Sequence, residues 1–228
     1  MFRSSWKFAA LAGAGLVIGA ATAGHAATLT GPVSYLSAAD IPANFYAGGS
    51  PLFLEDFEDG SLDGGITASA GAPYGPAGNA DSVDGDDGTI DGFGTAGRSF
   101  FYAGGSAGIT FTFAAPVTAA AVVWTDGAGT TYFEAFDTNG VSLGSIGPVA
   151  LADGTYSGTT SEDSFFGVQS ADGIGSIFIS NSLGGIEVDH VQYGDMYMGN
   201  PVPLPATLPL LAGAFAVAGA TLRRRQRN

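Results

Sequence analysis

Carboxylate side chains are the potentially reactive groups that this sequence supplies at the highest local density. The stretch DSVDGDDGTIDG, residues 81–92, begins with Asp81 and places four further aspartates among glycines, at Asp84, Asp86, Asp87 and Asp91. Carboxylate oxygens are ligands that Ca²⁺ prefers, and glycine lets the backbone turn its carbonyl groups toward an ion. The spacing does not match the EF-hand register. The stretch is therefore a candidate calcium site, with an exposed acidic turn as the alternative.

Carboxylates also serve in pairs in glycoside hydrolases, where one acts as the acid and the other as the nucleophile or base. Glu134, Glu162 and Glu187 are the candidates, and each is equally explained as an ordinary strand position. His190 is the single histidine beyond residue 25, but its neighbour Asp189 points to the opposite face of a strand. No Gly-x-Ser-x-Gly nucleophile motif accompanies it. We therefore expect a protein that is not an enzyme.

Aromatic side chains beside polar groups are candidates for stacking on sugar rings. Tyr132 and Glu134 alternate along one expected strand, so they share a face of the sheet. Trp124 stands next to a strand-to-turn junction that carries Asp126, and we expect its ring to be exposed. Packing in the core is the alternative for these rings. Trp124, Tyr132 and Glu134 are the candidate carbohydrate-binding residues.

The charge distribution excludes one class of partner. All 21 Asp and Glu residues lie between Asp40 and Asp195, and Arg98 is the only Lys or Arg in that region. Such a surface repels phosphate backbones, which excludes nucleic-acid binding, and it attracts divalent cations. Most of these acids are explained by solubility alone. The chain has no cysteine, which removes disulfides and thiolate metal sites.

The elements that must position these residues are predicted to be strands. Short aromatic and β-branched runs recur between glycine-rich turns, and no helical period appears in the central region. This pattern predicts an all-β fold, an antiparallel β-sandwich of jelly-roll type. Residues 58–97 are rich in Gly and Asp and are expected to be an irregular loop. The expected strands are residues 51–57, 98–103, 108–114, 117–125, 130–137, 141–146, 163–169, 175–180 and 186–193.

The first 26 residues have the organisation of a secretory signal peptide. Arg3 and Lys7 precede the apolar stretch from Phe8 to Ala21. Small residues at Gly24 and Ala26 then form a cleavage site for signal peptidase. An uncleaved membrane anchor is the alternative, but the apolar stretch is short for one. We expect an N-terminal signal peptide helix at residues 1–26 and an exported protein.

The C-terminal region, residues 199–228, combines a proline-rich motif, an apolar stretch and a basic end. Residues 204–222 would span about 28 Å as a helix, close to the thickness of a bilayer core. The arginines that follow would stay on the cytoplasmic side. This predicts a single transmembrane helix at 204–222 and a basic tail at 223–228. The residues of the motif and tail are Val202, Pro203, Leu204, Pro205, Ala206, Arg223, Arg224 and Arg225.

This arrangement resembles the VPLPA form of the PEP-CTERM sorting signal of Gram-negative bacteria. The resemblance covers about the last 27 residues, since VPLPA, the apolar stretch and RRR occur in that order. It implies recognition by an exosortase, removal of the tail, and release to or attachment at the cell surface. It also implies an association with exopolysaccharide and biofilm matrix.

The body, residues 27–198, resembles the exported β-sandwich domain found in proteins with this tail. The runs VVWTDG, FEAFDTNGVSLG, SEDSFFGV and GGIEVDHVQYG carry the resemblance. The last run is also similar to the final strand of carbohydrate-binding sandwiches. That similarity implies a structural calcium ion held by Asp189 and by Glu58 or Glu55.

Together these features predict an exported protein of the cell surface or extracellular matrix. Its non-catalytic sandwich would bind carbohydrate and calcium, with exopolysaccharide as a partner. A secreted polysaccharide-active hydrolase and a purely structural matrix subunit are the alternatives.

Overall fold

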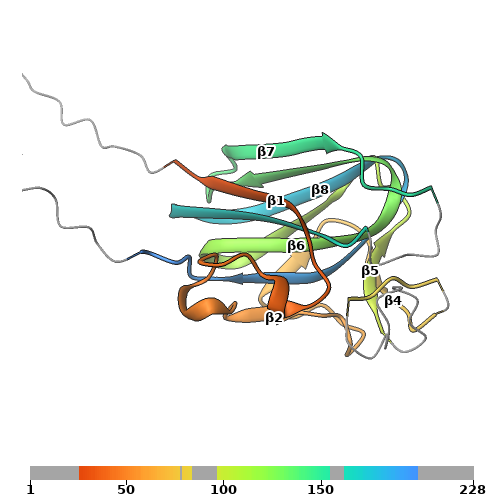
Figure 1. The fold of residues 1–228 in the computed structure, drawn as a ribbon, viewed down its shortest axis with the longest axis horizontal. Helices are drawn as coiled ribbons and strands as arrows, with labels where there is room; N and C mark the ends of the chain where they lie inside the picture. The colour runs from red at the N-terminus through yellow and green to blue at the C-terminus, as the bar shows by residue number, and fades with distance from the viewer. Residues whose placement is uncertain (1–25, 78, 84–96, 155–161, 200–228) are drawn as a thin grey trace, which may run out of the picture.

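The computed structural model describes residues 26–77, 79–83, 97–154 and 162–199, and this part of the chain is an antiparallel β structure (Figure 1). It contains two 3-10 helices, η1 (Ala38–Asp40) and η2 (Ala47–Gly49), and no α-helix within the described residues. Nor does any described helix have the length and apolarity to cross a bilayer. The strands are β1 (Thr28–Ser34), β2 (Phe53–Glu55), β3 (Ile66–Ala68), β4 (Ala72–Tyr74), β5 (Ser99–Tyr102), β6 (Ile109–Phe136), β7 (Ser142–Val149) and β8 (Ser164–Gly194).

Strands β6 and β8 organise the sheet, because each bends at breaks in its register and pairs with the other along several of its segments. Segment 119–124 of β6 lies between segments 164–169 and 188–194 of β8. Segment 176–179 of β8 lies between segments 109–112 and 133–136 of β6. The sheet therefore curls back on itself, as Figure 1 shows.

The shorter strands extend this curled sheet at its edges. Strands β1 and β2 pair with the first and last segments of β8, while β3 and β7 pair with the first and last segments of β6. Strand β5 joins β8 at residues 186–188 and carries β4 on its other side. In Figure 1 the two ends of the described chain leave at one end of the molecule, and β4 and β5 lie at the other.

Residues 119–124 are all apolar, without the alternation of apolar and polar residues that is typical of a strand buried on one face only. Val122 and Trp124 belong to the main core, together with residues such as Phe133. Ala121 and Val123 point the other way, into a second cluster with Phe45 and other aromatic residues. A strand that is buried on both faces reads as a continuous hydrophobic run rather than as alternation.

The all-β, antiparallel fold predicted from the sequence is confirmed. The expected strands at 108–114, 117–125 and 130–137 are parts of the continuous β6, and those at 163–169, 175–180 and 186–193 are parts of β8. Of the expected strand at 51–57, only the residues of β2 form a strand. The expected strand at 141–146 corresponds to β7, which ends three residues later than expected.

Two expectations differ from the structure or lie outside it. Residues 58–97 were expected to be irregular throughout, but they contain β3 and β4, and β1 was not expected at all. The expected helices of the signal peptide and of the transmembrane segment fall on residues 1–25 and 200–228, outside the described residues. Those helices stay predictions.

Asn181 holds Trp124 in the core at the bend of both long strands. The indole Nε1 of Trp124 donates to Asn181 Oδ1 at 2.9 Å, and Asn181 Nδ2 donates to the Gly185 carbonyl at 2.8 Å. Gly127 lies against this pair, because a Cβ there would stand 1.6 Å from Asn181 Nδ2. A side chain at position 127 therefore requires Asn181 to move away from Trp124.

We predict that Gly127→Ala lowers the free energy of unfolding by about 2–4 kcal/mol, because it overpacks the site and leaves the buried indole N–H without its acceptor. Gly64→Ala is the matched control, since a Cβ at Gly64 meets no atom within 4 Å, and it should change stability by less than about 0.5 kcal/mol. Urea denaturation followed by far-UV circular dichroism measures both. Equal stability of the two variants would contradict the prediction.

Candidate functional site

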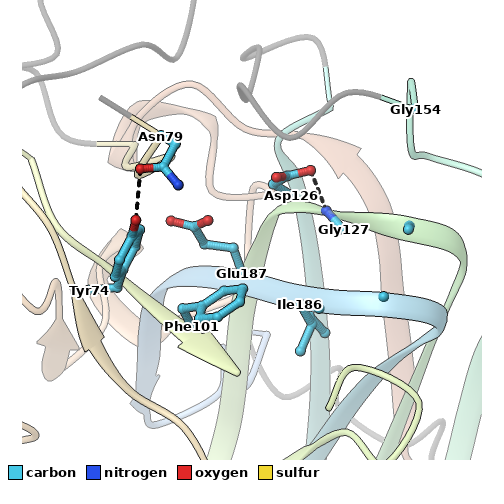
Figure 2. Close-up of a pocket in the computed structure, with 11 residues that line it drawn as sticks. Tyr74, Asn79, Phe101, Asp126, Gly127, Gly154, Ile186 and Glu187 are labelled. Carbon is cyan, nitrogen blue, oxygen red and sulfur yellow. Dashed lines mark hydrogen bonds between the residues drawn. The ribbon is translucent and has the colours of Figure 1, made fainter. Parts of the chain in front are cut away.

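A pocket of about 500 Å³ opens where β6 and β8 meet β4 and β5 (Figure 2). Its aromatic residues are Tyr74 from β4 and Phe101 from β5, and its side-chain hydrogen-bonding groups include Asn79, Asp126 and Glu187. The remaining lining residues are small or aliphatic: Gly127, Ala128, Gly154, Gly184, Gly185 and Ile186.

The aromatic side of the pocket is held by local contacts. The rings of Tyr74 and Phe101 pack at 5.6 Å between centroids and 45° between planes. The hydroxyl of Tyr74 donates to Asn79 Oδ1 at 2.7 Å. Phe101 is 37% exposed, and a Cβ at Gly185 would stand 2.8 Å from its Cε2. Glycine at 185 therefore leaves room for an exposed ring beside the pocket.

The acidic side of the pocket is a cross-strand pair. Asp126 of β6 and Glu187 of β8 are register partners, so their side chains lie on the same face of the sheet. Glu187 Oε1 accepts hydrogen bonds from the backbone N–H of Asp81 at 2.8 Å and from the hydroxyl of Ser99. Burial raises the pKa of Glu187 to about 7 against the lowering effect of these two donors, and Asp126 adds a further rise.

Further acidic side chains are buried next to this pair. Asp81, Glu162 and Asp163 are each at most 3% exposed. Burial, followed by repulsion from Asp163, Glu187, Asp126 and Glu162, raises the pKa of Asp81 to about 10. Burial also raises the pKa of Glu162 to about 7. We call these five residues, Asp81, Asp126, Glu162, Asp163 and Glu187, the acidic cluster.

Part of the acidic cluster has no hydrogen-bonding partner. Both carboxylate oxygens of Asp81, and Oε2 of Glu162, are buried and accept no hydrogen bond in the described part of the chain. Buried polar atoms are normally paired, so each of these oxygens requires an explanation. No three His, Asp or Glu side chains among the described residues are already grouped as a set that could hold a metal ion.

The predicted calcium ligands are only partly described. Asp84, Asp86, Asp87 and Asp91 lie outside the described residues. Glu58 accepts a hydrogen bond from the backbone N–H of Arg98. Asp189 is buried and accepts from the backbone N–H of Val83 at 2.9 Å and of His190 at 2.6 Å. Glu58 and Asp189 therefore hold neighbouring backbone in place, and calcium binding at the predicted residues stays a prediction.

The predicted carbohydrate-binding residues do not line the pocket. Trp124 is fully buried, so the expectation that its ring is exposed for stacking was wrong, because the residue belongs to a strand that is buried on both faces. Tyr132 and Glu134 do share a face of β6, where the tyrosine hydroxyl donates to Glu134 Oε2 at 3.1 Å. Both side chains are half-buried, away from the pocket.

Of the predicted hydrolase carboxylates, Glu162 and Glu187 enter the acidic cluster and Glu134 does not. His190 is buried, and its Nδ1 lies 3.0 Å from the hydroxyl of Tyr35. Sequence reasoning missed Tyr74, Asn79, Phe101 and Asp81 as site residues. The only local signal was that Asp81 is the first residue of the aspartate-rich stretch, since its hydrogen-bond partner Glu187 lies about one hundred residues away along the chain.

A second groove of about 500 Å³ lies beside β2. Phe53, which is 55% exposed, stacks on Tyr193 there with 5.0 Å between ring centroids. Asp63 and Asp195 also line it. The first pocket is the better candidate site, because it joins an aromatic wall to a cross-strand carboxylate pair with a raised pKa.

Comparison with known proteins gives little further information. No known protein family and no curated protein match the sequence. Among solved structures, the enzymatically active domain of bacteriophage CBA120 tailspike protein 4 aligns with a TM-score of 0.34 and 18% sequence identity. The alignment covers 61% of this chain and 20% of the phage chain. At this TM-score it supports no inference about this protein.

The raised pKa values predict that the free energy of unfolding falls as pH rises from 4.5 to 7.5 in metal-free buffer. The folded state binds its protons more tightly than the unfolded state does, so stability present near pH 4 is lost as these groups ionise. The rise in the pKa of Glu187 from 4.5 to about 7 corresponds, at about 1.4 kcal/mol per unit, to a loss of about 3.5 kcal/mol.

Urea denaturation at several pH values measures this loss. Glu187→Gln should flatten the pH dependence, whereas Glu134→Gln, at a carboxylate outside the acidic cluster, should leave it unchanged. A wild-type protein whose stability rises over this pH range would contradict the prediction.

Proposed function

We propose that this protein is an exported, non-catalytic β domain that binds a neutral glycan in the pocket between Tyr74, Phe101, Asn79, Asp126 and Glu187. The observation that supports this most is the combination of two aromatic rings, the exposed Phe101 and the half-buried Tyr74, with convergent hydrogen-bonding groups in one cavity of about 500 Å³. Such a cavity is within the size range of small-molecule sites. Sugars present C–H faces to aromatic rings and hydroxyl donors to carboxylates.

The charge of the pocket favours a neutral sugar over an acidic one. Asp126 and Glu187 line the cavity, and no Lys or Arg does so. A uronic acid or a sulfated sugar would bring its own negative charge beside these carboxylates, which costs free energy in a partly buried site. The neutral repeating units of an exopolysaccharide are therefore the proposed ligand class.

The arrangement of the strands supports a β-sandwich of jelly-roll type as the scaffold. Segments of β6 and β8 form two sets, one around residues 119–124 and the other around residues 176–179. The main core contains side chains from both sets, including Val122 and Ile177. Packing of the two sets against each other supports the proposed sandwich.

A polysaccharide hydrolase is the second candidate, and the cross-strand pair of Asp126 and Glu187 is the observation that favours it. A general acid needs a carboxyl group that stays protonated near neutral pH, and the raised pKa of Glu187 meets that requirement. The same raised pKa also follows from burial alone. We therefore rank binding without catalysis first.

We predict that the full chain binds neutral oligosaccharides on a glycan array, and that Phe101→Ala or Tyr74→Ala weakens binding about tenfold through lost ring contacts. Tyr132→Ala is the matched control, since that ring packs on Phe178 away from the pocket, and it should bind as the wild type does. Isothermal titration with the best array ligand measures the affinities.

Three outcomes would contradict this proposal. Loss of binding in Tyr132→Ala with retention in Phe101→Ala would move the site to the exposed face of β6. Binding to no neutral glycan would favour the purely structural alternative. Sustained release of reducing ends by the wild type, lost in Glu187→Gln but kept in Glu134→Gln, would make the protein a hydrolase.

We further propose that the C-terminal region directs the protein through the exosortase pathway to the cell surface or matrix. The support is the order of VPLPA, the apolar stretch and the arginines in the sequence. The described chain ends lie opposite β4 and β5 in Figure 1, so a molecule held by its C-terminus would present the pocket away from its attachment.

Deletion of residues 202–228 should leave the protein in the periplasm, because the sorting enzyme would have no substrate motif to recognise. Fractionation and immunoblotting of the expressing cells measure the distribution. If the shortened chain reaches the surface as efficiently as the intact one, the tail is not the sorting signal. A chain that stays in the cytosol with both ends intact would contradict export itself.

A further inference from the structure

The acidic cluster brings several buried carboxyl groups together. Its five carboxyl groups, at Asp81, Asp126, Glu162, Asp163 and Glu187, are each at most 7% exposed. The four charged groups that act most strongly on Asp81 are the other carboxylates of the cluster. Arg98 is the only Lys or Arg between Asp40 and Asp195, and its guanidinium donates to the carbonyl of Gly75 instead.

Buried charge of one sign is costly unless another charge compensates it. Removing a carboxylate from water costs several kcal/mol, and repulsion between neighbouring carboxylates adds to this cost. A protein has two ways to compensate the cluster without a basic side chain, namely bound protons or a bound cation. The hydrogen bonds of the cluster help to distinguish them.

The cluster contains oxygen atoms that are available as ligands. Glu187 Oε1 accepts hydrogen bonds from the hydroxyl of Ser99 and from the backbone N–H of Asp81. The side chain of Asp81 is 0% exposed, and neither of its oxygens has a hydrogen-bond partner in the described chain. A protonated Asp81 would also need an acceptor for its O–H, and no such bond is formed there.

We propose that the acidic cluster is a binding site for one divalent cation of the calcium type, with Asp81 as its central ligand and Glu162 and Glu187 beside it. The ligands are hard oxygen atoms, and Ca²⁺ accepts six to eight of them in flexible geometry, whereas Mg²⁺ requires a regular octahedron. The burial of Asp81 admits a small ion and excludes an organic cation. This site differs from the predicted one at Asp84–Asp91, and it does not depend on glycan binding.

The carboxylates of the acidic cluster are not at the spacing of metal ligands, so the proposed site requires their side chains to move together when the ion binds. No three acidic side chains among the described residues are already grouped at the spacing of metal ligands. Like charges separate when nothing between them attracts them. A divalent cation replaces this repulsion by attraction and draws the side chains together, so binding stabilises the folded state.

The test uses the full chain, treated with EDTA and dialysed into metal-free buffer at neutral pH. CaCl₂ is then added at constant ionic strength, with MgCl₂ and NaCl as controls. One Ca²⁺ per chain should bind in isothermal titration. At one hundred times the dissociation constant, Ca²⁺ should raise the melting temperature by about 5–10 °C.

Asp81→Asn tests the assignment of the site. This residue does not line the glycan pocket, so the variant should still bind the array ligand. It should lose Ca²⁺ affinity at least a hundredfold, yet melt no lower than the wild type in metal-free buffer, because the substitution removes repulsion. Glu134→Gln is the control and should keep both the affinity and the melting shift.

Each other outcome overturns the proposal. A shift below about 1 °C at millimolar Ca²⁺, with no heat of binding, would show that protons balance the cluster. Calcium binding that survives Asp81→Asn would place the ion elsewhere, with the aspartates at 84–91 as the next site to examine. An Asp81→Asn chain that is unfolded in metal-free buffer, judged by near-UV circular dichroism, would show that the side chain is required for folding and not for the ion.

Discussion

The burial of β6 on both of its faces is the constraint on which the rest of this structure depends. Residues 119–124 are fully buried, with alternate side chains in the main core and in the second cluster around Phe45. A strand in this position needs neighbours on both edges and a layer on each face. Segments 164–169 and 188–194 of β8 supply the edges. The curl of the sheet and the chain around Tyr35 and Phe45 supply the layers.

The candidate site begins where this double burial ends. Trp124 is the last apolar residue of the buried run, and Asp126 follows it with Glu187 directly opposite. The same pairing that completes the core therefore brings two carboxylates together at the mouth of the pocket. The hydrogen bond from Trp124 to Asn181 fixes the position of this junction. A rigid junction of this kind is what a binding site requires from its scaffold.

The sequence was sufficient to predict most of the strands but not their partners. Alternation at Ile109, Phe111 and Phe113 and the apolar run at 117–125 carry local signals, and both segments are strands. The pairing of Asp126 with Glu187 joins residues sixty positions apart, so it leaves no local pattern. Strands β3 and β4 have only three residues each, too few for a period to appear among their glycine neighbours.

The errors at the site have a physical origin too. Trp124 was expected at the surface because Asp126 and Gly127 follow it closely, but Asp126 is itself buried, so the polar residue did not mark an exposed turn. Asp81 was overlooked because its environment is set by Asp163 and Glu187, about eighty and one hundred residues away. Burial of several like charges is a property of tertiary structure, and no composition rule indicates it.

Glu187 belongs to both of the proposed sites, so the affinities of the two sites are linked. Its carboxylate lines the pocket that is proposed to bind glycan and also belongs to the acidic cluster with Asp81. An ion that draws the carboxylate toward the cluster changes the hydrogen-bonding wall that a sugar meets. Linkage then requires that glycan changes the affinity for the ion by the same factor by which the ion changes the affinity for glycan. On these two proposals, each ligand can bind without the other, but Glu187 would make the affinity for one depend on the presence of the other, without any larger change in the fold.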